Sequence, residues 1–194
     1  SVVEEQAQVL LRTAFSPIVR ESGDLSAGVF DRRGRMLAQA VTGTPGHVNS
    51  MARSVIHFIR EFPVDTMKPG DAYVTNDPWK GTGHLYDIVV TSPAFHNGKL
   101  VALFSCTTHV VDIGGLGQSP DGRQVFHEGL FLPLLPLMRE GKIDESVMRI
   151  VRATISCAIL VSRCQPAMSP SCWSSETGHN LHQKPEMLTH PSLA

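Results

Sequence analysis

The chain lacks the features that assign a protein at once to several common functional classes. Its 194 residues carry 17 Lys and Arg against 18 Asp and Glu, with a formal net charge of −1, and no run of basic residues. Nucleic acid is therefore not an expected partner, because binding to phosphate backbones requires a basic surface. No apolar run approaches the roughly 18 residues of a membrane span. No signal peptide opens the sequence, so no membrane association is expected.

Cysteine is also scarce. The four cysteines, Cys106, Cys157, Cys164 and Cys172, form no C-x-x-C pair, and a chain of this length does not need disulfides to fold. A reducing compartment, the cytoplasm, is the expected location. Cys106 lies in an apolar, strand-like run, which favours a buried and inert thiol.

Two motifs that would define an enzyme class are missing. The sequence has no G-x-x-x-x-G-K-[ST], so a P-loop ATP site is not expected. It has no G-x-S-x-G, which argues against a serine hydrolase with a nucleophile elbow. The glycines of Gly114-Gly115-x-Gly117 are compatible with a backbone cradle for phosphate or with a flexible lid.

Hydrophobic patterning predicts a mixed α+β fold in which β-hairpins pack against two or three helices. Helices are expected over residues 2–15, from the end of the 42–47 loop to about 62, and from 145 onward behind the N-cap Asp144. Strands are expected over residues 25–30, 36–41, 72–75, 87–95 and 99–109. Charged residues thin out near the C-terminus, with four of 35 after Ala153. We therefore expect a domain over 1–153 and a poorly ordered tail over 154–194.

The stretch between residues 70 and 129 contains His84, Asp87 and His109 beside glycine-rich loops. Two imidazoles and a carboxylate are typical ligands of a divalent metal that keeps open coordination positions. The same set suits the Fe(II) of a non-haem oxygenase. The plainer alternative is that both histidines end a loop and hydrogen-bond to backbone groups.

Whether these residues meet depends on the hairpin around Asn97-Gly98. A two-residue loop would pair Tyr86 with His109 and place Asp87 and His109 on opposite faces, which excludes a shared ion. A three-residue loop from His96 would make them diagonal neighbours on one face. A metal site thus requires the longer loop.

Several motifs read in order resemble the hydantoinase B/oxoprolinase family, over about residues 1–152. The family includes N-methylhydantoinase B subunits, the C-terminal half of 5-oxoprolinase, and the large subunits of acetone and acetophenone carboxylases. The motifs are Glu21-Ser22-Gly23-Asp24-Leu25-Ser26, the D-x-x-G-x-x-x-A-Q-A run from Asp31 to Ala40, Pro45-Gly46-His47, Asn76-Asp77-Pro78, Gly83-His84-Leu85-Tyr86-Asp87, the HVVDIGG run from His109 to Gly115, and His127-Glu128-Gly129-Leu130.

The resemblance implies that His84, Asp87 and His109 bind manganese or zinc. It also implies ATP-dependent hydrolysis of a cyclic amide such as a hydantoin or 5-oxoproline, with ATP bound by a separate hydantoinase A-type partner subunit that activates the small-molecule substrate. Asp112 is then a candidate general base or orienting residue, unless it only caps the glycine turn. Glu128, beside a turn, is expected to be structural.

Two other functions stay open. One is a ketone carboxylase of the acetone type, which the sequence does not separate from amide hydrolysis. The other is a non-catalytic fragment, because family members are usually much longer and this chain resembles only their N-terminal portion, a partial hydantoinase B-type domain. Apolar faces that the remaining portion would cover are then expected to be exposed.

Overall fold

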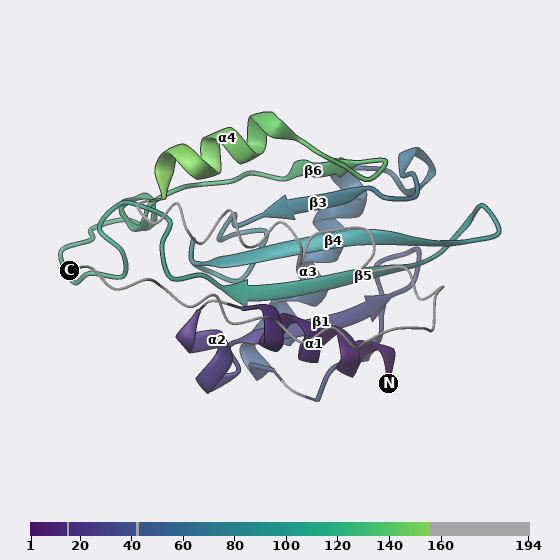
Figure 1. Cartoon of the computed structure of the whole chain (residues 1–194), viewed down its shortest axis with the longest axis horizontal. Helices are drawn as coiled ribbons and strands as arrows, with labels where there is room; N and C mark the ends of the chain where they lie inside the picture. Colours follow the sequence, from purple (N-terminus) through teal and green to yellow (C-terminus); the bar gives the residue numbers. More distant parts are fainter. Residues whose placement is uncertain (15, 42, 156–194) are drawn as a thin grey trace, which may run out of the picture.

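The structure is a computed structural model that describes residues 1–14, 16–41 and 43–155 (Figure 1). These residues form one antiparallel sheet of seven strands in the order β2-β1-β5-β4-β3-β6-β7. The strands are β1 (Leu25–Phe30), β2 (Met36–Gln39), β3 (Ala72–Thr75), β4 (Asp87–His96), β5 (Lys99–His109), β6 (Leu135–Arg139) and β7 (Lys142–Ile143). The helices are α1 (Val2–Thr13), α2 (Pro17–Ser22), α3 (Pro45–Glu61) and α4 (Glu145–Thr154), with 3-10 turns at Val64–Thr66 and Val125–Glu128. The predicted mixed α and β fold is confirmed.

Helices cover both faces of the sheet (Figure 1). On one face, α3 packs the buried side chains of Met51, Val55 and Phe58 against Val89 and Leu103 of the two central strands. On the other face, α1 and α2 cover β1, and α4 covers β3 and β6. Alternation along each strand supplies both faces with apolar side chains. Among the described helices, none is long and apolar enough to cross a membrane.

Helix α3 begins earlier than the sequence pattern indicated. Pro45 occupies its first turn, where a fixed φ favours a helix start and no backbone N–H is needed. The predicted loop over 42–47 is therefore wrong for its last three residues. His47 belongs to the first turn of α3, four residues before Met51 and on the same buried face.

Three elements were not predicted, or were left open. Helix α2 is a short segment with Ser16 as N-cap and left-handed Gly23 as C-cap. Strands β6 and β7 were not predicted: Pro136 within β6 argues against a strand, and β7 has only two residues. The sheet accepts Pro136 at an irregular pairing, where the register shifts between Ala72 and Tyr73 of β3. The prediction of a poorly ordered tail over 154–194 falls on residues that, after Ile155, lie outside the part of the chain that the structure describes.

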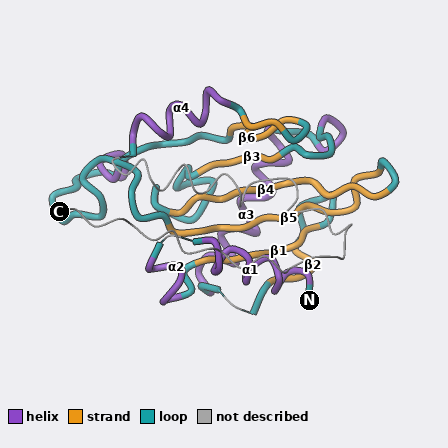
Figure 2. Tube along the Cα trace, viewed as in Figure 1, coloured by secondary structure: helices purple, strands orange, loops and turns teal. Residues whose placement is uncertain are grey.

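The β4–β5 hairpin turns through two residues, Asn97 with φ 49° and Gly98 with φ 73°, and its tip extends past the neighbouring strands (Figure 2). Both predicted registers are nevertheless wrong. The register shifts between Ala94 and Phe95, because Val101 is an extra residue on β5, and from there Asp87 lies directly opposite His109. The requirement of a longer loop is therefore wrong, but the two side chains do share one face.

Candidate metal centre

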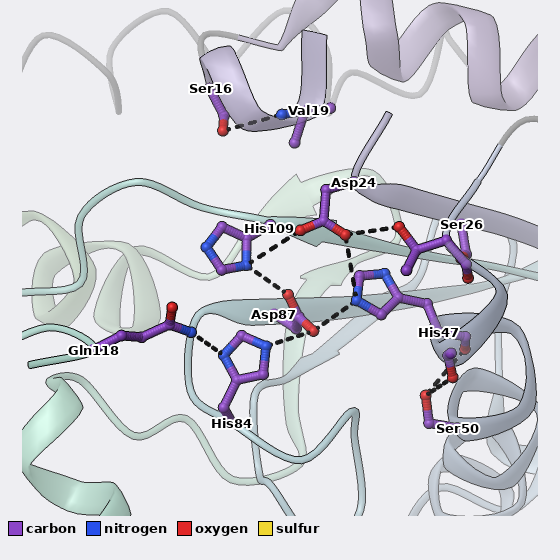
Figure 3. Close-up of polar contacts among 12 residues, drawn as sticks. Ser16, Val19, Asp24, Ser26, His47, Ser50, His84, Asp87, His109 and Gln118 are labelled. Carbon is purple, nitrogen blue, oxygen red and sulfur yellow. Dashed lines mark hydrogen bonds and ion pairs between the residues drawn. The ribbon is translucent and has the colours of Figure 1, made fainter. Parts of the chain in front are cut away.

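The three predicted ligands meet at one end of the sheet, where β4 begins, β5 ends and α3 starts (Figure 3). Asp87 is the centre of the cluster and is 1% exposed. Its Oδ1 lies 3.0 Å from Nδ1 of His109, and its Oδ2 lies 2.9 Å from Nε2 of His84. The donor atoms of these three residues lie within 4.8 Å of one another. The structure thus brings together all three residues that the sequence singled out.

Two further residues that the sequence analysis did not assign to the site complete the cluster. His47 of α3 places Nε2 2.9 Å from Oδ2 of Asp87. Asp24, which precedes β1, lies 3.5 Å from His47 and 3.7 Å from Nδ1 of His109. Asp24, His47 and Asp87 form a second set of donor atoms within 4.8 Å. Asp87 therefore belongs to both sets.

Asp24 is fixed in turn by the loop that leads into α3. The hydroxyl of Thr44 donates to Oδ1 of Asp24 at 2.7 Å, and the backbone N–H of His109 donates to the carbonyl of Asp24 at 3.2 Å. The chain entering β1, the end of β5 and the start of α3 are thus tied to one another at the cluster.

The segment carrying His84 is held by hydrogen bonds to its neighbour Leu85. Glu128 accepts the backbone N–H of Leu85 at 2.7 Å, and the amide of Asn76 donates to the carbonyl of Leu85 at 2.8 Å. Buried Asn76 also bonds backbone groups of the 130–132 segment. Both backbone groups of Leu85 are satisfied, so Glu128 and Asn76 fix the loop from which His84 reaches Asp87.

The other ring nitrogen of His84 contacts Gln118. The two nitrogens, Nδ1 of His84 and Nε2 of Gln118, lie 3.0 Å apart. Since the two ends of a glutamine amide are assigned from their surroundings, the exchanged orientation would let Oε1 accept a hydrogen bond from a protonated Nδ1. The contact with Gln118 is made through Nδ1, and Nε2 of His84 faces Oδ2 of Asp87, 2.9 Å away.

Electrostatics around Asp87 favour its charged form. Burial alone would raise the pKa of the Asp87 carboxyl, but the neighbouring imidazoles of His109, His47 and His84 outweigh burial and hold that pKa well below its usual range. Burial lowers the pKa of His47, but the contact with Asp87 outweighs burial, so the pKa of His47 is raised overall. The pKa of His84 is also raised, chiefly through its contact with Asp87. The cluster therefore contains an ionised buried carboxylate that demands a positive partner.

These residues fit a divalent cation. Although two imidazole nitrogens lie 2.9 Å from it, the buried Oδ2 of Asp87 has no hydrogen bond of acceptable geometry. Imidazole nitrogens with carboxylate oxygens are the donors that Zn²⁺ and Mn²⁺ accept. His84, Asp87 and His109 would hold the ion.

Asp112 lies just beyond the cluster. Its Oδ1 accepts the backbone N–H of Gly114 at 2.9 Å, so the predicted turn-capping contact is present. Tyr86 stacks on the ring of His109, with centroids 5.4 Å apart. Burial, followed by the charges of Asp112 and Glu128, raises the pKa of Tyr86. The Asp112 carboxylate is therefore close enough to influence a ring that touches the cluster.

The glycine-rich loop has a structural explanation that needs no phosphate. Gly114, Gly115 and Gly117 have φ of 72°, 67° and 66°. A Cβ on Gly115 would lie 2.7 Å from the backbone of Gly129. Left-handed backbone and this close approach account for glycine at these positions. Hydrogen bonds between the 113–116 and 127–130 segments, each 2.8 Å long, tie the loop down.

Comparison with known proteins adds an independent finding. The family described as Hydantoinase B/oxoprolinase matches residues 1–167, which is most of the sequence. The chain belongs to this family. The resemblance inferred from the ordered motifs is confirmed.

Two relatives and one solved structure show what the family contains. The 5-oxoprolinase PfmaA of Pestalotiopsis fici is 34% identical over 152 residues, which cover 77% of this chain and 12% of that protein. The caprolactamase subunit beta of Pseudomonas jessenii is 29% identical over 150 residues, 76% of this chain and 26% of that protein. The crystal structure of the ATP-dependent caprolactamase from that organism superposes with a TM-score of 0.73 and 26% identity, covering 86% of this chain and 29% of the other.

The fold also occurs in a carboxylase. Nucleotide-free acetone carboxylase superposes with a TM-score of 0.71 at 22% identity, over 87% of this chain and 23% of that chain. At that identity the likeness shows the fold alone. This chain spans about an eighth to a quarter of the length of the two relatives it matches in sequence. Its family includes 5-oxoprolinase and caprolactamase enzymes, so the family is one of hydrolase-type enzymes.

Proposed function

We propose that this chain is the metal-binding portion of an ATP-dependent cyclic-amide hydrolase, acting with a partner subunit that activates the substrate. The observation that carries the proposal is the buried Asp87, ionised and surrounded by three imidazoles, in a chain whose relatives include 5-oxoprolinase and an ATP-dependent caprolactamase. A lactam or hydantoin ring resists direct attack by water because its amide is resonance-stabilised. Phosphorylation of the amide oxygen by a hydantoinase A-type subunit removes that resistance.

The residues of this chain would then prepare the attack. A divalent ion held by His84, Asp87 and His109 would supply Lewis acidity or a bound water of lowered pKa. Asp87 holds His84 and His109 in orientation through its two oxygens. Asp112 is the candidate that accepts the proton of the attacking water, which requires that it exchange its contact with Gly114 for one with water. Asp24 and His47 keep Asp87 and His109 in place.

A second function, ketone carboxylation of the acetone type, is left open by the motifs that the chain shares with the hydantoinase B/oxoprolinase family. In that case the same residues would serve attack by the α-carbon of an activated ketone on a carboxyl donor formed from bicarbonate, rather than attack by water on an activated amide. Ring opening and carboxylation give different products in the same ATP-dependent assay. Product analysis therefore separates them.

The test uses the full chain with a purified A-type subunit, ATP and either Mn²⁺ or Zn²⁺. Candidate substrates are 5-oxoproline, hydantoin, caprolactam, and acetone with bicarbonate. The expected result is ADP formation coupled to a ring-opened acid, lost in His109→Ala. Carboxylation of acetone would replace the hydrolase proposal with the carboxylase one. Metal binding at His109 without any turnover would instead support a non-catalytic fragment.

A further inference from the structure

A tight turn between β3 and the metal centre presents a tryptophan at the surface. Trp79 is 69% exposed, whereas Asp77, at the start of the turn, is buried. The backbone N–H of Trp79 donates to Oδ1 of Asp77 at 3.0 Å. The N–H groups of the next two residues donate to the Asp77 carbonyl at 3.1 and 2.6 Å. Because the turn is already ordered, little conformational freedom is lost when the exposed side chain binds a partner.

A second exposed aromatic side chain lies beside Trp79. Phe126 is 50% exposed, and its ring centroid lies 6.0 Å from that of Trp79. Phe131 supports Phe126 through an edge-to-face contact at 5.5 Å. Aromatic side chains are enriched where proteins contact one another. Rings this exposed do not suit a small-molecule pocket, since such pockets are concave and bury most of their ligand.

Basic side chains lie next to this turn. Arg53 and Arg60 are exposed on α3, and within the part of the chain that the structure describes neither forms an ion pair. His57 lies between them on the helix. Its pKa is lowered first by burial and then by the charges of Arg60, Lys80 and Arg53, so all three cations lie near one imidazole. The whole chain has a net charge of −1, so this positive surface is a local feature.

The same turn leads into the metal centre. His84 follows Gly81 by three residues, and Phe126 lies two residues before Glu128, whose carboxylate holds the backbone of Leu85. An amide oxygen that carries a phosphoryl group is reactive, so an activated substrate has to reach the metal centre without meeting bulk water. The subunit that activates the substrate therefore has to bind beside the metal centre.

We propose that the surface formed by Trp79, Phe126 and the two exposed arginines of α3 is where the activating partner subunit docks. The partner presents an apolar recess for Trp79, and acidic side chains around that recess face Arg53 and Arg60. Trp and Arg are enriched among the residues that dominate the binding energy of protein interfaces, and exposed charges steer association and select the partner. This inference rests on the proposed function, which supplies the partner.

The test measures binding of the full chain, loaded with Mn²⁺, to the purified A-type subunit by biolayer interferometry. Trp79→Ala should weaken the affinity at least about 30-fold, as expected for a central anchor. Leu37→Ala is the matched control, because Leu37 is 63% exposed but lies on the edge strand β2, at the far side of the sheet from β3. Its affinity should stay unchanged. Wild-type metal content in Trp79→Ala shows that the metal centre is intact.

The charges are tested separately. Arg53→Glu combined with Arg60→Glu should slow association at least about tenfold at low salt, and the difference should shrink at high salt because ions screen the attraction. Arg12→Glu combined with Arg20→Glu is the control, since these arginines belong to α1 and α2 on the other face of the sheet. The control should associate at the wild-type rate.

A direct readout comes from fluorine NMR. Trp173→Phe leaves Trp79 as the only tryptophan of the chain, and the signal of fluorotryptophan at this position should shift when the A-type subunit is added. An unshifted signal in the complex, or an unchanged affinity in Trp79→Ala, would overturn the docking surface and leave the proposed function in place. A wild-type chain that binds no A-type subunit would overturn both. Trp79-dependent dimerisation of the chain alone, seen by sedimentation velocity, would overturn the proposal by assigning the surface to a second copy.

Discussion

The β4–β5 hairpin carries a histidine beside a polar partner at each of its ends, and only one end is a candidate site. At the tip, Nε2 of His96 lies 3.2 Å from the side-chain amide of Asn97, and both are exposed. At the base, Nδ1 of His109 lies 3.0 Å from Oδ1 of Asp87, and these residues are 8% and 1% exposed. The pairs have similar distances and the same strands. What differs is their surroundings.

At the base, burial removes water as a partner for Asp87, so its charge must be met by other side chains. His84, His47 and Asp24 converge there from three other segments of the chain. At the tip, water meets the same need. A metal centre therefore requires a buried carboxylate at which several segments converge, and a neighbouring histidine alone is insufficient.

The largest effect is expected from a change of register at the base. Deleting Thr108 moves His109 by one position and turns its side chain to the other face of the sheet, away from Asp87. Bound Mn²⁺ or Zn²⁺ should be lost, and the melting temperature should fall. Metal content and circular dichroism measure both.

Deletion of Val101, nearer the tip, is the matched control. It removes the extra residue of the bulge and leaves Asp87 opposite His109. Metal content should stay at the wild-type level. Loss of metal in both deletion variants would contradict the assigned register.

The next largest effect is expected from Asp87→Asn, which keeps the size of the side chain and removes its charge. Three imidazoles lose their shared anionic partner, so metal binding should fall below detection. Without metal, the free energy of unfolding should fall by about 2 kcal/mol, the typical contribution of a buried hydrogen bond to a charged group. Titration calorimetry and urea unfolding provide the two values.

The converse change at the tip sharpens the comparison. Asn97→Asp creates a His-Asp neighbour pair there, and Asp tolerates the left-handed backbone at this position. No second ion should bind, because water already satisfies both groups. A gain of one ion per chain would show that burial is less important than we infer.

His109→Ala is expected to destabilise the protein less than Asp87→Asn does, but to abolish metal binding completely. Elemental analysis of untagged protein should show about one Mn or Zn per chain in the wild type and none in the variant. His96→Ala, at the other end of the hairpin, should keep the wild-type content. Equal metal in both variants would place the ion elsewhere.

Much of this architecture follows from local sequence signals. The Asn97-Gly98 turn, the two long strands and the amphipathic face of α3 were predicted, since each is encoded by neighbouring residues. The bulge was missed, although Leu100 and Leu103 are both buried, three positions apart, where a regular strand alternates in twos. That spacing is the signal that an extra residue intervenes.

The site was predicted only in part, for a physical reason. His84, Asp87 and His109 lie on one hairpin and its adjoining loop, so local register decides their meeting. Asp24 and His47 arrive through the packing of β1 and α3, which no spacing specifies. Of these, His47 had a signal, because it lies four residues before buried Met51 on the same helical face.

The smallest of these effects is expected at His47, which contacts the carboxylates of Asp24 and Asp87 but is not itself one of the proposed ligands. Removing a residue that orients metal ligands typically weakens metal affinity by about 10–100-fold. His47→Ala should fall in that range, and His47→Gln should lose less, because its amide NH2 group keeps a polar contact with the Asp87 carboxylate. His57→Ala, on the same helix, is the control and should leave the Kd unchanged. Competition with a chelator gives the Kd values. An unchanged Kd in His47→Ala would mean that β4 and β5 alone orient Asp87, whereas complete loss of the ion would make His47 a ligand.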